Sequence, residues 1–160
     1  MTNWQQGKYQ PKNAAKYIGK HIPHYRSGWE LQFCRMCDDH PSIIAWASES
    51  HKIPYIHPIT GKRSNYVPDF FVVYMDKQGK KHAEIVEIKP SGQMVGNAKG
   101  QYDQAQAVIN EAKWNSARQW CKAQGIGFRI VTEKDMFNKP QKNRAQKKAK
   151  VAKVAKRKKR

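Results

Sequence analysis

The stretch Tyr66-Val67-Pro68-Asp69-Phe70, together with Glu87-Ile88-Lys89 further along the chain, decides the fold that we expect for this sequence. An apolar run follows Asp69, a polar turn with one glycine occupies residues 76–79, and a second apolar run leads to Glu87. This pattern is typical of a β-hairpin. Since the side chains of a strand alternate between its two faces, Glu87 and Lys89 project to one face and their apolar neighbours to the other. The hairpin therefore predicts that Asp69, Glu87 and Lys89 meet at one place.

Two carboxylates and an ammonium group at one place have a chemical use in the hydrolysis of phosphodiester bonds. Mg²⁺ prefers oxygen ligands and keeps several of its waters, so one or two carboxylates from the protein are enough. Asp69 and Glu87 are the candidate ligands, with the backbone carbonyl of Ile88 as a third. Lys89 would lie beside a metal-bound water, where it orients that water, lowers its pKa or stabilises the pentacovalent phosphate. A plainer interpretation is a solvated strand face with cross-strand ion pairs.

Glu30 has two interpretations. It lies near the start of a helix that we expect to open within residues 25–30 and to run to about Asp39, because Pro41 limits its continuation. Ser27 and Glu30 have the spacing of a capping box, in which each side chain bonds a backbone N–H group of the other residue. Glu30 also begins the helical stripe that continues through Phe33, Cys34 and Cys37, so it shares the inward face. That position favours a third acidic residue of the site, and the two roles are compatible.

The rest of the pattern predicts an α/β protein. Apolar runs predict strands at residues 43–47, 53–57 and 128–132, with a short helical turn at residues 133–137, and a glycine-rich loop is expected at residues 91–100. An amphipathic helix is expected over residues 102–122, ended by Gly125 and Gly127. The fold class is therefore a mixed β-sheet flanked by helices. The apolar positions that mark the long helix are Ala105, Val108, Ile109, Ala112, Ala117, Trp120 and Cys121.

Three segments follow from composition. Residues 1–24 predict an N-terminal arm packed by Trp4, Tyr9, Tyr17 and Ile22, residues 25–138 form the core, and residues 139–160 form a basic tail. No apolar run is long enough to span a bilayer, and the polar start carries no signal-peptide core, so we expect a cytoplasmic protein.

The formal net charge is +19, and the tail holds 12 of the 31 Lys and Arg residues but no acidic residue. Such a tail cannot bury a core, so it is expected to be unstructured when free. Counterion release favours its use as a non-specific DNA tether, and a solubility tail or a nuclear address are the alternatives. The candidate DNA-binding residues are Lys139, Lys142, Arg144, Lys147, Lys148, Lys150, Lys153, Lys156, Arg157, Lys158, Lys159 and Arg160.

Other chemistry has weaker support in the sequence. Cys34-x-x-Cys37 has the spacing of half a zinc site, but it lacks a second pair, so core packing is the favoured interpretation. Three cysteines without a secretion signal argue against disulfides. No glycine-rich phosphate loop is present, so we expect no nucleotide cofactor.

The order Pro68-Asp69 followed by Glu87-x-Lys89 resembles the signature of the PD-(D/E)XK nuclease superfamily, which implies a restriction-endonuclease-like core. Three further stretches look like its TnsA-like branch, and particularly like the head completion nucleases of T-even-type tailed phages. These stretches are Arg26-Ser27-Gly28-Trp29-Glu30, Ile53-Pro54-Tyr55 and Phe128-Arg129-Ile130-Val131-Thr132-Glu133. The TnsA-like pattern often has glutamine where this chain has Glu87, and the departure is toward the commoner ligand of the superfamily.

The resemblance implies a metal-dependent DNA endonuclease. Glu30, Asp69, Glu87 and the carbonyl of Ile88 would hold one or two Mg²⁺ ions, for which Mn²⁺ can substitute, and Lys89 would act on the attacking water. The phage members imply a part in finishing the DNA-filled capsid before tail attachment. That role implies double-stranded DNA and the portal or neck proteins as partners, and the host cytoplasm and the virion as locations.

Two rival functions stay open at this point. One is a non-catalytic DNA-binding protein that closes the DNA-filled capsid with its basic surface. The other is a transposase-partner endonuclease, which needs a recruiting protein and defined DNA ends. Loss of function on substitution of Asp69 distinguishes an enzyme from the first rival.

Overall fold

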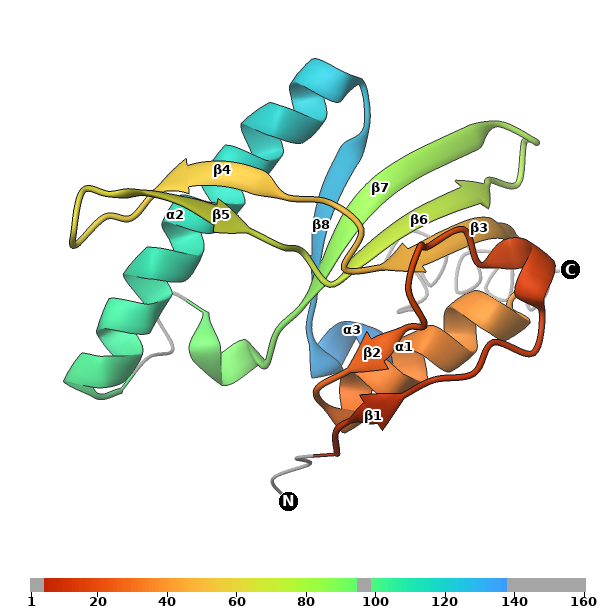
Figure 1. The fold of residues 1–160 in the computed structure, drawn as a ribbon, viewed down its shortest axis with the longest axis horizontal. Coiled ribbons are helices and arrows are strands. Elements are labelled where there is room, and N and C mark those ends of the chain that lie inside the picture. The colour runs from red at the N-terminus through yellow and green to blue at the C-terminus, as the bar shows by residue number, and fades with distance from the viewer. Residues whose placement is uncertain (1–4, 95–98, 138–160) are drawn as a thin grey trace, which may run out of the picture.

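The computed structural model describes residues 5–94 and 99–137 of the 160-residue chain (Figure 1). The candidate DNA-binding tail, residues 139–160, therefore lies outside the described residues, as does Trp4. In chain order the elements are β1 (Gly7–Lys8), η1 (Ala14–Lys16), β2 (His24–Tyr25), α1 (Gly28–Asp39), β3 (Ile43–Ser48), β4 (Ile53–Ile56), β5 (Arg63–Tyr66), β6 (Phe70–Met75), β7 (Lys81–Ile88), η2 (Ser91–Gln93), α2 (Gln101–Gln124), β8 (Gly127–Val131) and α3 (Glu133–Phe137).

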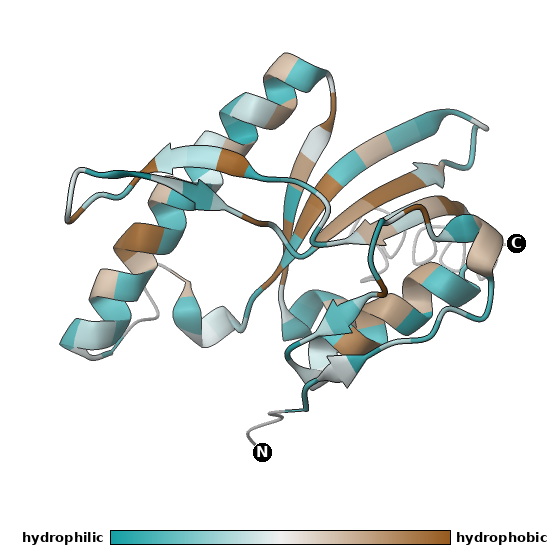
Figure 2. Ribbon diagram, viewed as in Figure 1, coloured by the Kyte–Doolittle hydropathy of each residue, from teal (hydrophilic) through white to brown (hydrophobic). Residues whose placement is uncertain are grey.

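A four-stranded mixed sheet of order β3-β6-β7-β8 forms the centre of the fold. The β6–β7 hairpin is antiparallel and pairs Phe70 with Val86 and Met75 with Lys81, which confirms the predicted hairpin. Its turn uses Gly79 at φ 79°, a conformation that favours glycine. β8 runs parallel to β7 and places Val131 beside Ile88. Hydrophobic residues follow most of β6 and the C-terminal half of β7, while the half of β7 next to the turn is hydrophilic (Figure 2).

Helix α1 covers one face of the sheet. Ser27 caps it, since its side-chain oxygen accepts a hydrogen bond from the Glu30 N–H. The predicted inward stripe is confirmed: Phe33, Cys34 and Cys37 are buried in one cluster with Val86, Ile88 and residues of β3 and β6. The cysteines are free thiols within this core.

The N-terminal arm is fastened to the C-terminal end of α1 by the buried side chain of Asp38. Its carboxylate accepts hydrogen bonds from the Tyr9 hydroxyl at 2.7 Å, the Lys12 N–H at 2.7 Å and the Asn13 N–H at 2.9 Å. Tyr9 and Tyr17 pack against the ring of Trp46, a contact that the sequence did not predict. The prediction for Ile22 is wrong, because this side chain is 52% exposed.

A second unit of structure packs beside the sheet. β4 and β5 form a separate antiparallel hairpin that lies across α2 (Figure 1). The pattern of the sequence predicted β4 but missed β5, because Arg63-Ser64-Asn65 has no apolar alternation. Ile53, Tyr55 and Tyr66 of the hairpin form a buried cluster with Trp114 and Ala117 of α2.

Helix α2 matches the predicted helix in extent, and Gly125 ends it at φ 71°. Its predicted inward face is wrong in part, since Val108 is 52% exposed while Ala107 and Asn110 are buried. The buried stripe follows Trp114, whose ring fills the space against the β4–β5 hairpin and so sets which side of the helix turns inward. Across residues 5–94 and 99–137, no helix combines the length and apolar character needed to cross a bilayer.

Candidate active site

The structure brings Asp69, Glu87 and Lys89 together at one end of the β6–β7 hairpin. Asp69 precedes β6, and its Oδ2 accepts a hydrogen bond from the Ile88 N–H at 2.8 Å. Glu87 Oε2 accepts one from the Asp69 N–H at 3.3 Å, so each carboxylate is held by a backbone N–H of the other segment. Lys89 Nζ lies 3.7 Å from Glu87 Oε1. The sheet register therefore brings two carboxylates and one ammonium group close together in space.

Charge at this site is poorly compensated. Burial raises the pKa of Asp69 well above its ordinary value of 3.8, and the negative charges of Glu87 and Glu30 raise it further. Burial also raises the pKa of Glu87, although the hydrogen bond from Tyr66 and the charge of Lys89 act in the opposite direction. Two carboxylates that repel each other in a partly desolvated place cost free energy unless a cation lies between them.

Glu30 takes part in capping α1, and its role as an acidic residue of the site stays a prediction. Its Oε2 accepts a hydrogen bond from the Arg26 N–H at 3.0 Å, and its Oε1 accepts one from the Ser27 hydroxyl at 3.3 Å. The backbone bond goes to the residue before the N-cap, so the capping box is only half formed. Burial raises the pKa of Glu30, against these hydrogen bonds, and the charge of Glu49 adds to the effect. Glu30 is thus a cap whose charge also reaches Asp69.

Two residues beside the carboxylates had no role in the sequence interpretation. Tyr66, buried on β5, donates its hydroxyl hydrogen to Glu87 Oε2 at 2.6 Å. Burial and the charge of Glu87 raise the pKa of Tyr66, so it stays a donor. Lys113 of α2 lies over the rings of Tyr55 and Tyr66, 5.7 and 5.9 Å from their centroids, and its charge lowers the pKa of Glu87.

Only some of the residues around the carboxylates could be predicted from the sequence. Tyr66 lies within the quoted motif stretch, three residues before Asp69, so its proximity was predictable. Nothing in the pattern of α2 marks Lys113, which reaches the site only because Trp114 docks the helix on the hairpin. Glu49 also lies near the site only because of the tertiary fold. Its N–H donates a hydrogen bond to the Asp69 carbonyl at 2.9 Å, and its carboxylate forms an ion pair with Arg26 at 3.1 Å.

The donor set fits a hard divalent cation held by few protein ligands. Within the described ranges, no three His, Cys, Asp or Glu side chains form a group that could hold a metal ion by themselves. Mg²⁺ does not require such a group, because one or two carboxylates, a carbonyl and water complete its octahedron. The closeness of the Asp69 and Glu87 carboxylates in a partly desolvated place favours a cation there. The ligand roles of Glu30 and the Ile88 carbonyl stay predictions.

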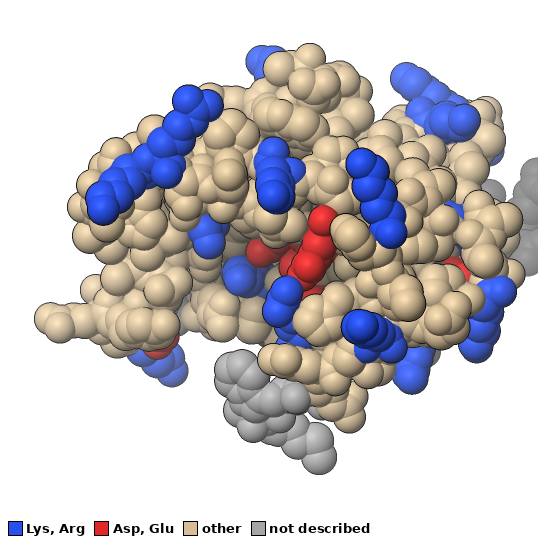
Figure 3. Space-filling model, viewed as in Figure 1, with Lys and Arg blue, Asp and Glu red and all other residues tan. Residues whose placement is uncertain are grey.

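The surface around the acidic residues is basic. Figure 3 shows acidic side chains gathered in a hollow near the centre of this face, with Lys and Arg side chains on the surrounding surface. An anionic backbone is attracted by such a surface, while the hollow itself attracts cations.

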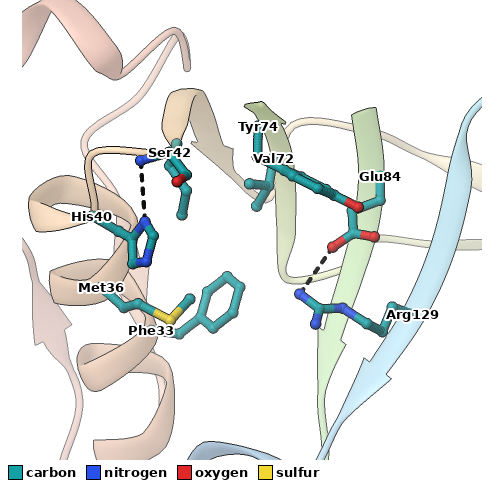
Figure 4. Close-up of a pocket in the computed structure, with 9 residues that line it drawn as sticks. Phe33, Met36, His40, Ser42, Val72, Tyr74, Glu84 and Arg129 are labelled. Atoms are coloured by element: carbon teal, nitrogen blue, oxygen red, sulfur yellow. Dashed lines mark hydrogen bonds and ion pairs between the residues drawn. The ribbon is translucent and has the colours of Figure 1, made fainter. Parts of the chain in front are cut away.

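A separate cavity of about 260 Å³ lies between α1 and the sheet (Figure 4). Phe33, Met36 and Val72 give it apolar walls, and the ion pair between Glu84 and Arg129 closes one side at 2.9 Å. None of the predicted site residues lines this cavity, so it is not part of the candidate active site.

A mixed sheet whose central hairpin presents Asp69, Glu87 and Lys89 in this order has the core of a PD-(D/E)XK-type nuclease. The family described as TnsA-like endonuclease N terminal matches residues 40–133, a range that includes these three residues but not Glu30. The chain therefore belongs to the TnsA-like endonucleases. It is also similar to the head completion nuclease of Enterobacteria phage T4, with 36% identity over 140 residues, covering 79% of this chain and 90% of that protein. The enzyme class that follows is a deoxyribonuclease.

Proposed function

We propose that the chain is a Mg²⁺-dependent DNA endonuclease of phage head completion, with its active site at Asp69, Glu87 and Lys89. The observation that carries the proposal is the hydrogen-bonded but mutually repelling pair of Asp69 and Glu87 beside a lysine. Such a pair is costly in an apo protein and useful in a metal enzyme.

Each residue has a role that its contacts support. Asp69 and Glu87 would hold the ion with the Ile88 carbonyl, and Glu30 would add negative charge from α1. A bound Mg²⁺ supplies Lewis acidity at the scissile phosphate and lowers the pKa of bound water. Lys89, whose Nζ lies 3.7 Å from Glu87, orients the attacking water and stabilises charge on the phosphate.

Tyr66 and Lys113 are positioning residues in this scheme. The Tyr66 hydroxyl holds one oxygen of Glu87 and leaves Oε1 directed toward Lys89. The cation of Lys113 favours the ionised form of Glu87, which a metal ligand requires.

The place of action is proposed from the phage relative. That relative is named a head completion nuclease, and most of its length aligns with this chain. We therefore propose that this chain trims or cuts DNA at the filled capsid, in the host cytoplasm and the virion, next to the portal or neck proteins. The tail, residues 139–160, would tether the enzyme to DNA through its 12 cations. Its deletion is expected to weaken binding and flatten the salt dependence of affinity.

The direct test is cleavage of linear and circular duplex DNA by the purified protein and by Asp69→Ala, with and without Mg²⁺, and with DNA binding recorded alongside. We expect Mg²⁺-dependent cleavage by the parent only, and binding by the variant within a few-fold of the parent, because its positive surface is intact. Cleavage by Asp69→Ala at the parent rate would disprove the site. Binding without cleavage by the parent, with Mg²⁺ and also with Mn²⁺, would favour the non-catalytic capsid role.

Thermal stability measures the binding of Mg²⁺ independently of DNA cleavage. An ion that binds the folded state raises thermal stability by an amount set by its concentration and affinity. Mg²⁺ is expected to raise the melting temperature of the parent and to have little effect on Asp69→Asn or Glu87→Gln. Equal shifts in all three proteins would place the ion elsewhere.

A further inference from the structure

The β4–β5 hairpin carries a surface whose charge has one sign. Between Glu49 and Asp69 the chain has no acidic residue, but it has Lys52, Lys62 and Arg63. All three cations are exposed. A stretch of 19 residues without a carboxylate, in a segment that ends at the active site, attracts a polyanion along its whole length.

The inner face of the β4–β5 hairpin is buried against α2. Ile53, Tyr55 and Tyr66 point toward α2, where they are buried against Trp114 and Ala117. Ile53 and Tyr66 also form a cross-strand pair, so the register is fixed by the buried side. The hairpin is therefore held as a unit on α2, and its outer face stays free of packing in the described part of the chain.

The outer face combines the three cations with exposed apolar side chains. Ile56 is 58% exposed and pairs across the strands with Arg63, and Ile59 at the tip is 62% exposed. The tip turns through Gly61 at φ 69°, which keeps it narrow. This face of the hairpin therefore offers a partner both positive charge and apolar side chains.

We propose that the outer face of the β4–β5 hairpin is a DNA-docking arm that lies in the major groove of the duplex to be cut. This inference rests on the proposed nuclease function and adds the surface that holds its substrate. A two-stranded ribbon has the size that the major groove admits. Lys52, Lys62 and Arg63 then contact phosphates at the groove edges, and Ile56 and Ile59 contact the thymine methyl groups on its floor.

The position of the arm supports this choice of partner. β5 ends at Tyr66, and only Val67 and Pro68 separate it from Asp69, so a duplex on the arm has its backbone next to the carboxylates. Tyr66 joins the two regions directly, because it is part of the buried face of the arm and bonds Glu87. An acidic protein partner is the competing occupant, and the experiment below distinguishes it.

The chain offers a matched control in its other hairpin. The β6–β7 turn also carries three exposed cations, Lys77, Lys80 and Lys81, at the far end of β6 and β7 from Asp69. We therefore compare Lys52→Gln/Lys62→Gln/Arg63→Gln with Lys77→Gln/Lys80→Gln/Lys81→Gln, which remove equal charge. Binding of a short duplex is measured against salt without Mg²⁺, so that cleavage plays no part.

The arm variant is expected to bind at least about tenfold more weakly and to lower the slope of log K against log salt by about 2 to 3, since each lost phosphate contact removes about 0.9 from it. The control variant is expected to keep the parent slope. Ile56→Thr/Ile59→Thr, which keeps good strand formers, is expected to weaken binding a few-fold at an unchanged slope. Equal slopes in the arm and control variants, or an unchanged affinity in the isoleucine variant, would overturn the proposal.

Cross-linking locates the DNA without relying on affinity. Thr60→Cys on the arm and Gln78→Cys on the control turn are both exposed positions for a thiol-directed photo-cross-linker. The three native thiols are buried, and burial raises the pKa of Cys34 to about 12 and of Cys121 to about 11, so labelling is selective. DNA adducts at position 60 and not at 78 are expected.

The two proposals can fail separately in these experiments. A parent that cross-links DNA through position 60 but does not cut it would refute the proposed chemistry and keep the arm. A parent that cuts DNA while position 60 cross-links no better than position 78 would refute the arm and keep the nuclease. Adducts between position 60 and an added acidic protein in place of DNA would also overturn the arm.

Discussion

Asp38 and the pair Asp69–Glu87 are two regions of buried carboxylate with opposite electrostatics. Burial raises the pKa of Asp38, but the hydrogen bonds from Tyr9, Lys12 and Asn13 outweigh it, and the pKa lies below its ordinary value of 3.8. At Asp69, burial and the charges of two neighbouring carboxylates outweigh the hydrogen bond from Ile88 and the charge of Lys89, so its pKa lies well above 3.8. One region has as many donors as its charge requires, and the other has a surplus of negative charge.

The difference separates a structural carboxylate from a functional one. A buried charge that is fully hydrogen-bonded fastens two segments together, here the N-terminal arm and α1. A buried charge that repels its neighbour is unfavourable in the apo protein despite its hydrogen bonds, so its presence points to a ligand of opposite sign. The predictions below test this distinction with paired substitutions.

The largest expected contrast is in catalysis. Glu87→Gln keeps an acceptor for Tyr66 but removes the charge of a metal ligand, so Mg²⁺-dependent cleavage should fall on the order of a thousandfold. Asp38→Ala, measured at low temperature on folded protein, should retain the parent rate per folded molecule. Initial rates on plasmid DNA give both values. A large loss of cleavage in folded Asp38→Ala would mean that the arm takes part in the reaction.

The next contrast is in stability. Asp38→Ala leaves the Tyr9 hydroxyl and the Lys12 and Asn13 N–H groups without their acceptor, which should cost about 2 to 4 kcal/mol in the free energy of unfolding. The exposed neighbour Asp39 provides the control, because Asp39→Ala should change stability by less than about 0.5 kcal/mol. Urea denaturation measures both. Similar effects in the two variants would show that Asp38 does not fasten the arm.

The same comparison explains how far sequence alone could go. The hairpin, α1 and β8 follow from local periodicity and capping, and the hairpin register then brings Asp69 to Glu87. Helical periodicity places Asp38 one turn after Cys34 on the inward stripe of α1, and Asp39 outside that stripe, but it does not show what satisfies the buried charge of Asp38. Their difference arises because a segment more than 20 residues earlier wraps over the end of α1 and supplies the donors.

The missed site residues have the same cause. Lys113 reaches Tyr66 through the docking of α2, and β5 is a polar strand that exists because its partner β4 and the helix hold it. Long-range packing of this kind leaves no periodic signal. Tyr66 was within the predicted motif stretch, but its bond to Glu87 depends on the second hairpin being folded against α2.

A smaller effect of opposite sign is expected at the functional carboxylate. Asp69→Asn keeps an oxygen that accepts from the Ile88 N–H while removing the charge that Glu87 and Glu30 repel. Without metal, the variant should be more stable than the parent, because burial and two neighbouring carboxylates disfavour the charge that is removed. Calorimetry in EDTA tests this. A variant less stable than the parent would mean that the charge of Asp69 is compensated after all.

The two carboxylates should also respond to acid at different points. A raised folded pKa means that the unfavourable charge of Asp69 is absent at low pH and is felt increasingly as pH rises from 3.8 toward the folded value. The stability gained by Asp69→Asn should therefore shrink first as pH is lowered from about 7 to about 4.

The lowered pKa of Asp38 has the opposite consequence. In the folded protein Asp38 contributes its full stability above pH 3.8, and it loses this contribution only as pH falls through the folded pKa. The deficit of Asp38→Ala should thus stay constant over that range and close only at lower pH. The test is to measure the free energies of unfolding of the parent and both variants across this pH range. If the stability differences of Asp69→Asn and Asp38→Ala from the parent disappeared at the same pH, the two regions would share one electrostatic environment.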